Sequence, residues 1–180
     1  MAKQVSKTYG NALFEVALEN HTLDATLDEV ISVKQTFLDN EELSKFLLHP
    51  NIEKEEKIKV IENIYKGKVS DELTGLMMML VSKGHMKDFI PVFDYVIDAI
   101  KEEKGIGVAH ITSASELTKE QRTRIEQRLL ETTKYREIEG VYKVDSTLIG
   151  GLVIRIQDMV VDSSLKTQIA KLSNQLQQEG

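Results

Sequence analysis

Residues 105–112, GIGVAHIT, divide the 180-residue chain into two parts with different hydrophobic periodicity. Before this stretch, apolar residues recur every three or four positions, which is the period of amphipathic helices. From Gly107 onward, β-branched residues and alternating polarity are typical of half-buried strands. We therefore predict a mainly α chain with a smaller α+β part, in which residues 1–105 form a helical bundle and residues 106–180 form a domain of short strands and helices.

The N-terminal part is expected to contain six short helices. Their apolar stripes place them near residues 5–18, 23–38, 43–47, 58–65, 70–84 and 88–100. Pro50 ends the third helix because the residue before a proline disfavours helical geometry, whereas Pro91 is tolerated in the first turn of the sixth. Ser70 can cap the fifth helix by accepting a hydrogen bond from an early backbone N–H. Helices of this number and length indicate a six-helix bundle.

The C-terminal part combines strands with two helices. Strands are predicted at residues 107–112, 141–145 and 152–156. Thr118 and Gln121 have the spacing of a capping box and begin a helix between the first two strands. The last helix follows Ser163 or Ser164, and it carries one apolar stripe on a polar surface, so it either docks on a partner or protrudes. That stripe consists of Leu165, Ile169, Leu172 and Leu176.

Composition excludes several classes of protein. Hydrophobic residues make up 41% and charged residues 29%, close to the average of packed soluble proteins. The formal net charge of -6 opposes nucleic-acid binding, which needs a positively charged surface. No uncharged stretch approaches the roughly 20 residues that span a bilayer, and no signal-type apolar run follows the first lysine. Because cysteine is also absent, we expect a protein of a reducing compartment, the cytoplasm, without membrane insertion.

No catalytic, cofactor-binding or metal-binding residues are predicted. The histidines are scattered, and no pair has the one-turn spacing of a helical zinc site. Gly105 and Gly107 begin like a dinucleotide-binding fingerprint, but His110 stands where the third glycine belongs. Carboxylate pairs can act as general acid and base wherever a fold brings them together, yet the sequence singles out no pair. A small carboxylate enzyme is one of the three functional hypotheses that the residues leave open.

Two features of the fifth predicted helix suggest contact with a partner. Residues 76–81, LMMMLV, wrap apolar side chains around the helix, so they cannot all face one core. Gly75 costs about 1 kcal/mol relative to alanine inside a helix, which indicates close approach by a neighbouring helix or by a ligand helix. The alternative is that the bundle buries this helix centrally and uses its methionines to fill gaps. The first helix also has a second apolar face, so a groove between the two helices would suit an amphipathic helix.

Residues 145–165, DSTLIGGLVIRIQDMVVDSSL, closely resemble the C-terminal signature of the delta (OSCP) subunit family of F-type ATP synthases. Residues 9–14, YGNALF, also resemble the start of that family, and the order of elements fits nearly the whole chain. The family more often has glycine at three turn positions, which here are Gln157, Ser163 and Thr167. We expect those turns to differ in detail.

The signature residues are expected to have structural roles. Gly150 and Gly151 permit a tight bend or bulge before a strand, and Asp158 suits the turn after it. Asp162 leads into the last helix as part of a turn and cap. The complete set of signature residues is Asp145, Gly150, Gly151, Arg155, Asp158 and Asp162.

The resemblance implies a non-catalytic stator subunit that links the catalytic head of the synthase to its peripheral stalk. The N-terminal helix of an alpha subunit would lie in the groove between the first and fifth helices, and the C-terminal domain would bind the b subunits of the stalk. The protein would then lie peripherally on the cytoplasmic face of the plasma membrane. The groove positions that match the family are Tyr9, Ala12, Leu13, Val16, Gly75, Leu76, Met79 and Lys83.

Two alternatives to this hypothesis remain open at the level of the sequence. The groove positions can instead be ordinary bundle core, most of all Leu13 and Leu76. A helical adaptor or regulator of another cytoplasmic complex would also have this composition and periodicity. No nucleic-acid partner and no cofactor are expected under either hypothesis.

Overall fold

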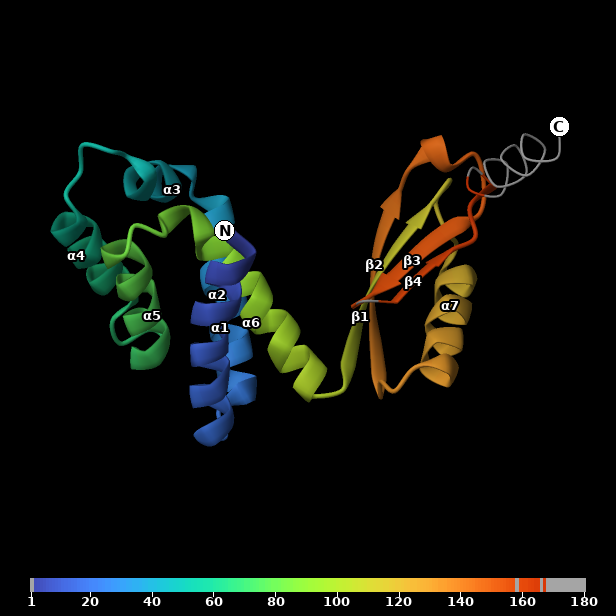
Figure 1. The fold of residues 1–180 in the computed structure, drawn as a ribbon, viewed down its shortest axis with the longest axis horizontal. Helices are drawn as coiled ribbons and strands as arrows, with labels where there is room; N and C mark the ends of the chain where they lie inside the picture. Colours follow the sequence, from blue (N-terminus) through green and yellow to red (C-terminus); the bar gives the residue numbers. More distant parts are fainter. Residues whose placement is uncertain (1, 158, 166, 168–180) are drawn as a thin grey trace, which may run out of the picture. The chain divides into compact units, whose positions relative to one another are not determined.

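The structure is a computed structural model, and it describes residues 2–157, 159–165 and 167 (Figure 1). The chain divides into two compact units, Met1–Ile100 and Lys101–Gly180. The division falls inside the last turns of a helix that leads from the first unit into the second. Each unit has its own core of buried apolar residues.

The first unit confirms the predicted six-helix bundle. Its helices are α1 (Ala2–Glu19), α2 (Leu23–Asp39), α3 (Glu41–Leu48), α4 (Lys54–Tyr65), α5 (Asp71–Ser82) and α6 (Phe89–Glu103). A 3-10 turn at Met86–Asp88 precedes α6, which therefore begins one residue later than expected. Pro91 lies in the first turn of α6, where a missing backbone N–H costs little.

Local signals set the ends of these helices much as predicted. His49 is extended, with ψ 125°, and α3 ends before Pro50. The Ser70 hydroxyl accepts a hydrogen bond from the backbone N–H of Leu73 and caps α5. Glu29 of α2 adds a long-range contact, because its carboxylate accepts hydrogen bonds from the Ser70 backbone N–H (3.0 Å) and hydroxyl (2.6 Å). The start of α5 is therefore anchored to α2.

Aromatic rings from three helices meet in the core of the first unit. Phe37 of α2 stacks on Phe89 of α6 with ring centroids 5.0 Å apart, and Phe93 lies 5.9 Å from both. Tyr65 of α4 also stacks on Phe37, with ring centroids 6.2 Å apart, and burial raises the pKa of its hydroxyl to about 12. These rings hold α2, α4 and α6 together.

The second unit is a four-stranded sheet with one described helix on its face (Figure 1). Its elements are β1 (Ile106–Ser113), α7 (Lys119–Thr132), β2 (Glu137–Val144), a 3-10 turn (Ser146–Leu148), β3 (Leu152–Ile156) and β4 (Met159–Asp162). The strand order is β2-β1-β3-β4, with β1 and β2 parallel and the other pairs antiparallel. The capping box of Thr118 and Gln121 is present, as predicted. This mainly helical chain with a C-terminal α+β part is the fold class that the sequence predicted.

Two strands differ from the prediction. β2 begins at Glu137, four residues before the predicted start, because residues 137–140 pair with β1 although glutamate and glycine disfavour strands. β4 was not predicted at all, since its four residues follow directly after the turn that ends β3. The predicted last helix lies mostly outside the described residues.

Candidate partner-binding groove

Helices α1 and α5 form the two walls of an apolar groove in the first unit. Its volume is about 310 Å³. The lining residues are Tyr9, Ala12, Leu13 and Val16 of α1 and Glu72, Gly75, Leu76 and Met79 of α5. Seven of the eight groove positions predicted from the sequence are therefore brought together. The eighth, Lys83, is the exposed C-cap residue of α5, one turn beyond Met79.

The two wall helices run antiparallel. Val16, near the end of α1, lines a smaller neighbouring cavity of about 120 Å³ together with Ser70 and Glu72 at the start of α5. At the opposite end, the ring of Tyr9 lies 5.7 Å from the ring of His85, which follows α5. The groove consequently extends along about two turns of each helix.

Burial divides the groove residues into a floor and a rim. Leu13 is 4% exposed and Leu76 is 7% exposed, so both belong to the bundle core and form the floor. Val16 is 37% exposed and Met79 is 50% exposed, so these two side chains form the rim. The alternative hypothesis, that the groove positions are ordinary bundle core, therefore holds for Leu13 and Leu76. It does not hold for the two rim residues.

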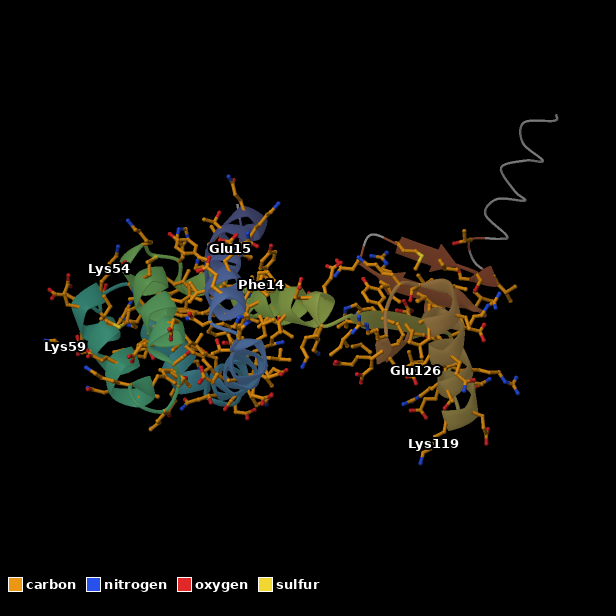
Figure 2. The ribbon with its side chains drawn as sticks, turned by 90° about the horizontal axis from the view of Figure 1, so that it is seen from below. Phe14, Glu15, Lys54, Lys59, Lys119 and Glu126 are labelled. Atoms are coloured by element: carbon orange, nitrogen blue, oxygen red, sulfur yellow. The ribbon has the colours of Figure 1, made fainter. Side chains whose placement is uncertain are left out.

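The methionine run has a similar division. Met77 is fully buried, Met78 is half-buried and Met79 lies on the groove rim. Central burial of α5 thus accounts for Met77 but not for Met79. On α1, Phe14 packs against the core whereas its neighbour Glu15 is exposed (Figure 2).

Gly75 opens the α5 wall of the groove. Apart from the adjacent residues and the backbone of α5 itself, no heavy atom of the described residues lies within 4 Å of the place where a Cβ would stand on Gly75. No neighbouring helix in the described part of the chain therefore explains this glycine, although close approach by such a helix was one of the two expectations. The other expectation, a ligand helix, stays a prediction.

Glu72 is the groove residue that the sequence prediction missed. It occupies the same stripe of α5 as Leu76, Met79 and Lys83, one turn before Leu76. An acidic residue in the first turn of a helix is readily explained by the helix dipole, so the residue type alone does not mark Glu72 as a groove residue. The spacing along the stripe was the signal that identifies it.

The signature residues of the second unit hold a compact turn. The Asp145 carboxylate accepts hydrogen bonds from the backbone N–H (2.9 Å) and hydroxyl (2.7 Å) of Thr147. Asp162 accepts from the Ser164 backbone N–H (2.9 Å) and the Thr167 hydroxyl (2.7 Å). These contacts fix the backbone on either side of the β3–β4 hairpin.

The two signature glycines lie where these turns meet. Gly151 has φ 77°, a conformation that favours glycine, and a Cβ there would overlap the backbone carbonyl of Ser163. A Cβ on Gly150 would stand 2.6 Å from the Leu165 side chain. Arg155 is exposed on β3, paired with His110 of β1, and Asp158 lies outside the described residues. The described signature residues thus make turns and sheet contacts rather than a chemical site.

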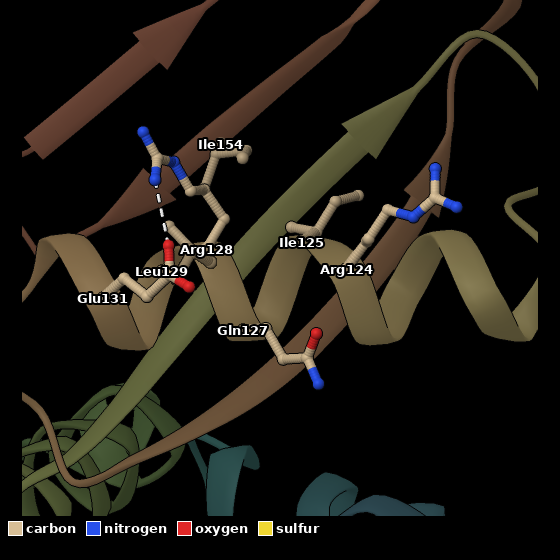
Figure 3. Close-up of a pocket in the computed structure, with 7 residues that line it drawn as sticks. All are labelled: Arg124, Ile125, Gln127, Arg128, Leu129, Glu131 and Ile154. Carbon is tan, nitrogen blue, oxygen red and sulfur yellow. Dashed lines mark hydrogen bonds and ion pairs between the residues drawn. The ribbon is translucent and has the colours of Figure 1, made fainter.

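A second apolar cavity, which the sequence did not predict, lies between α7 and β3. It has a volume of about 470 Å³ and is lined by Arg124, Ile125, Gln127, Arg128, Leu129, Glu131 and Ile154 (Figure 3). Met159 and Val161 of β4 share this face of the sheet, because Val161 pairs with Ile154 and Met159 with Ile156. Both side chains are more than two-fifths exposed. The second unit therefore also presents apolar surface.

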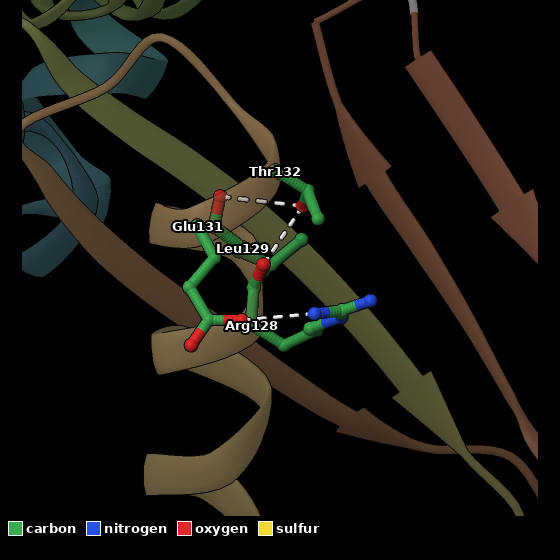
Figure 4. A network of polar contacts seen from close by, with 4 residues as sticks. All are labelled: Arg128, Leu129, Glu131 and Thr132. Carbon is green, nitrogen blue, oxygen red and sulfur yellow. Dashed lines mark hydrogen bonds and ion pairs between the residues drawn. The ribbon is translucent and has the colours of Figure 1, made fainter.

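Polar contacts at the end of α7 border this cavity (Figure 4). The Arg128 guanidinium pairs with the Glu131 carboxylate at 2.9 Å, one turn along the helix. The Thr132 hydroxyl donates to the Arg128 carbonyl at 2.8 Å.

Within the described residues, no cluster of histidine and carboxylate side chains is suited to a metal ion, and no helix is long and apolar enough to cross a membrane.

Comparison with known proteins identifies the family. The family model described as ATP synthase delta (OSCP) subunit matches residues 5–176. The protein called ATP synthase subunit delta in Lachnoclostridium phytofermentans is 51% identical over 176 residues, covering 98% of this chain and 97% of that protein. The protein of the same name in Prochlorococcus marinus is 32% identical and covers 96% of each chain.

A solved structure has the same fold. A chain of the Toxoplasma gondii mitochondrial ATP synthase hexamer superimposes with a TM-score of 0.81 over 95% of this chain and 96% of that chain, at 19% identity. At that identity the likeness speaks for the fold alone. The family match over nearly the whole sequence and the identity to bacterial relatives agree with the resemblance of residues 145–165: the chain belongs to the ATP synthase delta (OSCP) subunit family.

Proposed function

We propose that this chain is the non-catalytic stator subunit that joins the catalytic head of an ATP synthase to its peripheral stalk. By holding the head still against the rotating central stalk, it would let proton flow drive ATP synthesis. Membership of the delta family supports this role. The chain would act peripherally, at the cytoplasmic face of the plasma membrane.

The N-terminal unit would hold the head by binding the N-terminal helix of an alpha subunit between α1 and α5. The observation that carries this proposal is the groove itself, with exposed apolar rims and a glycine that leaves room for a helix. Helix-in-groove recognition uses apolar anchors at helical spacing, which fits a groove that follows two helices. The occupant is therefore an amphipathic helix that presents one apolar stripe.

Energetics favour two attachments rather than one. Four partner side chains buried in the groove contribute on the order of 6–12 kcal/mol, at about 1.5–3 kcal/mol each. The lost translational and rotational freedom of association costs about 4–15 kcal/mol. One groove alone consequently gives modest affinity. A second contact, between the C-terminal unit and the b subunits of the stalk, would raise the overall affinity through high effective concentration.

The exposed apolar surface of the second unit supports that second contact. The cavity beside α7 and the exposed Met159 and Val161 lie on one face of the sheet, and they resemble surfaces that partners cover. Arg124 at the cavity edge adds a positive charge that suits an acidic partner. The b subunits would therefore contact this unit and leave the α1–α5 groove to the alpha subunit.

Titration calorimetry with a synthetic peptide of the alpha-subunit N-terminus tests the groove. Ala12→Asp places a charge on the exposed part of the groove wall, so we expect it to weaken binding at least about tenfold, the loss that accompanies about 1.4 kcal/mol. Ser32→Asp adds the same charge on an exposed position of α2 and is the matched control. Equal affinities of the two variants, or no binding by the wild type, would contradict the proposal.

A further inference from the structure

The sheet of the second unit has two edges among the described strands, formed by β2 and β4. An edge strand presents backbone N–H and C=O groups that can pair with another chain, and proteins usually protect it with charged side chains, proline or a bulge. β2 carries three charged residues, Glu137, Glu139 and Lys143. Glu139 also pairs with Lys101 at 2.6 Å. The β2 edge is therefore protected.

The β4 edge lacks this protection. Its first three residues, Met159, Val160 and Val161, are apolar and between 44% and 54% exposed. The strand contains no proline or lysine, and each of its residues pairs with one residue of β3, so it has no bulge. The charged residue of the strand is Asp162 at its end, and that carboxylate already accepts hydrogen bonds inside the following turn. No described strand lies beyond β4.

The register of β3 and β4 determines which backbone groups point out of the sheet. The Ser163 backbone N–H donates to the Leu152 carbonyl at 3.0 Å, so these residues form a hydrogen-bonded pair of the antiparallel ladder. Such pairs alternate with non-hydrogen-bonded pairs, which makes Val160 and Arg155 a non-hydrogen-bonded pair. The N–H and C=O groups of Val160 therefore point away from β3 towards the open edge, whereas those of Val161 point into the ladder.

Positive charges lie beside this edge on both faces of the sheet. Arg124 borders the cavity on the α7 face, and Arg155 is exposed on the opposite face, because successive strand residues alternate between the faces. Neither guanidinium has an ion-pair partner among the described residues. Glu131, which lines the same cavity, is already paired with Arg128 at 2.9 Å. A partner with apolar side chains flanked by acidic ones therefore complements this edge.

We propose that β4 is a site of β-strand addition, at which an extended segment of the stalk partner pairs with the open edge. The backbone groups of Val160 bind the main chain of that segment. Its alternate side chains contact Met159 and Val161 on one face of the sheet and Val160 on the other. An amphipathic helix also covers apolar surface, but its backbone groups are bonded to one another and do not pair with the outward N–H of Val160. The register of β4 therefore favours a strand as the occupant.

This inference rests on the proposed function, since it takes the stalk as the source of the added strand. The test uses the full chain and the soluble part of the b subunits, followed by amide hydrogen exchange. Binding is expected to slow the exchange of the Val160 amide at least about tenfold, while the Val161 amide, which already faces β3, changes little. A bound complex in which Val160 is not protected overturns strand addition but leaves the stalk contact intact. Failure of the wild-type chain to bind contradicts the proposed function instead.

A proline variant gives a second readout. Val160→Pro removes an N–H that faces outward, which an edge strand tolerates, and it is expected to weaken binding of the b subunits at least about tenfold. Val160→Thr keeps the N–H and the β-branched shape, so this matched control should lose less than about threefold. If the proline variant does not fold, Met159→Lys replaces it, because a charge also blocks strand addition. Equal affinity of the blocked variant and the control overturns the proposal, as does a dimer of the free chain that protects Val160.

Discussion

The α1–α5 groove and the signature turn of residues 145–165 differ in how much of their role is visible in the sequence. The turn is recognised at once, yet its residues serve backbone geometry: Gly151 has φ 77°, and Asp145 and Asp162 accept backbone hydrogen bonds. The groove uses ordinary helix residues, and its distinctive features are exposure and position. The most recognisable stretch of a chain can therefore identify its family while another region carries the surface that we propose for binding.

The largest expected effect lies in the turn. Gly151→Ala should destabilise the second unit by about 2–3 kcal/mol, because it combines an unfavourable φ with overlap onto the Ser163 carbonyl. Denaturant-dependent amide hydrogen exchange of residues in β1 and β3 measures this loss of unfolding free energy. Gly67→Ala is the control, since Gly67 has φ 75° but nothing within 4 Å of a Cβ among the described residues, and it should cost only about 1 kcal/mol. Equal losses would refute the overlap.

Removal of a turn acceptor should have the next largest effect. Asp162→Ala leaves the Ser164 backbone N–H without its acceptor and is expected to cost about 1 kcal/mol of unfolding free energy. Asp39→Ala removes a carboxylate that bonds only the exposed Gln35 side chain in the described structure, so it should change stability by less than about 0.5 kcal/mol. Thermal unfolding of both variants provides the comparison. A neutral Asp162→Ala would mean that the turn does not depend on this carboxylate.

Gln157 offers a gain rather than a loss. Its φ is 50°, in the left-handed region, and the resemblance predicted a family glycine at this position. Gln157→Gly should therefore stabilise the second unit by about 1 kcal/mol, less any loss of the Gln157 hydrogen bond to the Glu102 carboxylate. Gln157→Ala, which loses the same hydrogen bond without gaining the backbone freedom, separates the two effects in the same unfolding assay. A glycine variant no more stable than the alanine variant would exclude strain at Gln157.

The groove rim should show the smallest effect on stability. Val16 is 37% exposed, so Val16→Ala is expected to cost less than about 1 kcal/mol of unfolding free energy, whereas Val30→Ala in the fully buried core should cost about 2 kcal/mol or more. Calorimetry with the alpha N-terminal peptide should nevertheless detect weaker binding by Val16→Ala. Unchanged binding would remove Val16 from the contact surface.

Periodicity and local signals predicted most of the fold. The six helices, the Thr118–Gln121 capping box and the bounds of β3 follow from apolar spacing and capping residues. The start of β2 and the whole of β4 could not be predicted in this way. β2 is held by pairing with β1 and β4 by pairing with β3, and this pairing overrides a weak local preference for strand. Short strands depend on their neighbours, which one sequence does not display.

All eight predicted groove positions came from the resemblance, and the structure gathers seven of them along two helices. Glu72 was missed because an acidic residue in the first turn of a helix needs no partner to explain it, and the cavity beside α7 was missed because it joins residues from α7 and β3. The exposure of Met79 and the absence of a described neighbouring side chain near Gly75 result from the tertiary packing of the bundle. Sequence spacing identifies which residues share a helix face, but only the packed bundle distinguishes its floor from its rim.

The most direct test of the groove measures stability and binding in the same variant, Gly75→Leu. Because Gly75 is helical and no described atom lies near its Cβ position, leucine should raise the unfolding free energy by about 0.5–1 kcal/mol while it fills the groove. We predict that this more stable protein loses binding to the alpha N-terminal peptide at least about tenfold, whereas Gly75→Ala, with its smaller side chain, loses less. Wild-type affinity in Gly75→Leu would contradict the account, since a helix seated between α1 and α5 has no room for that side chain.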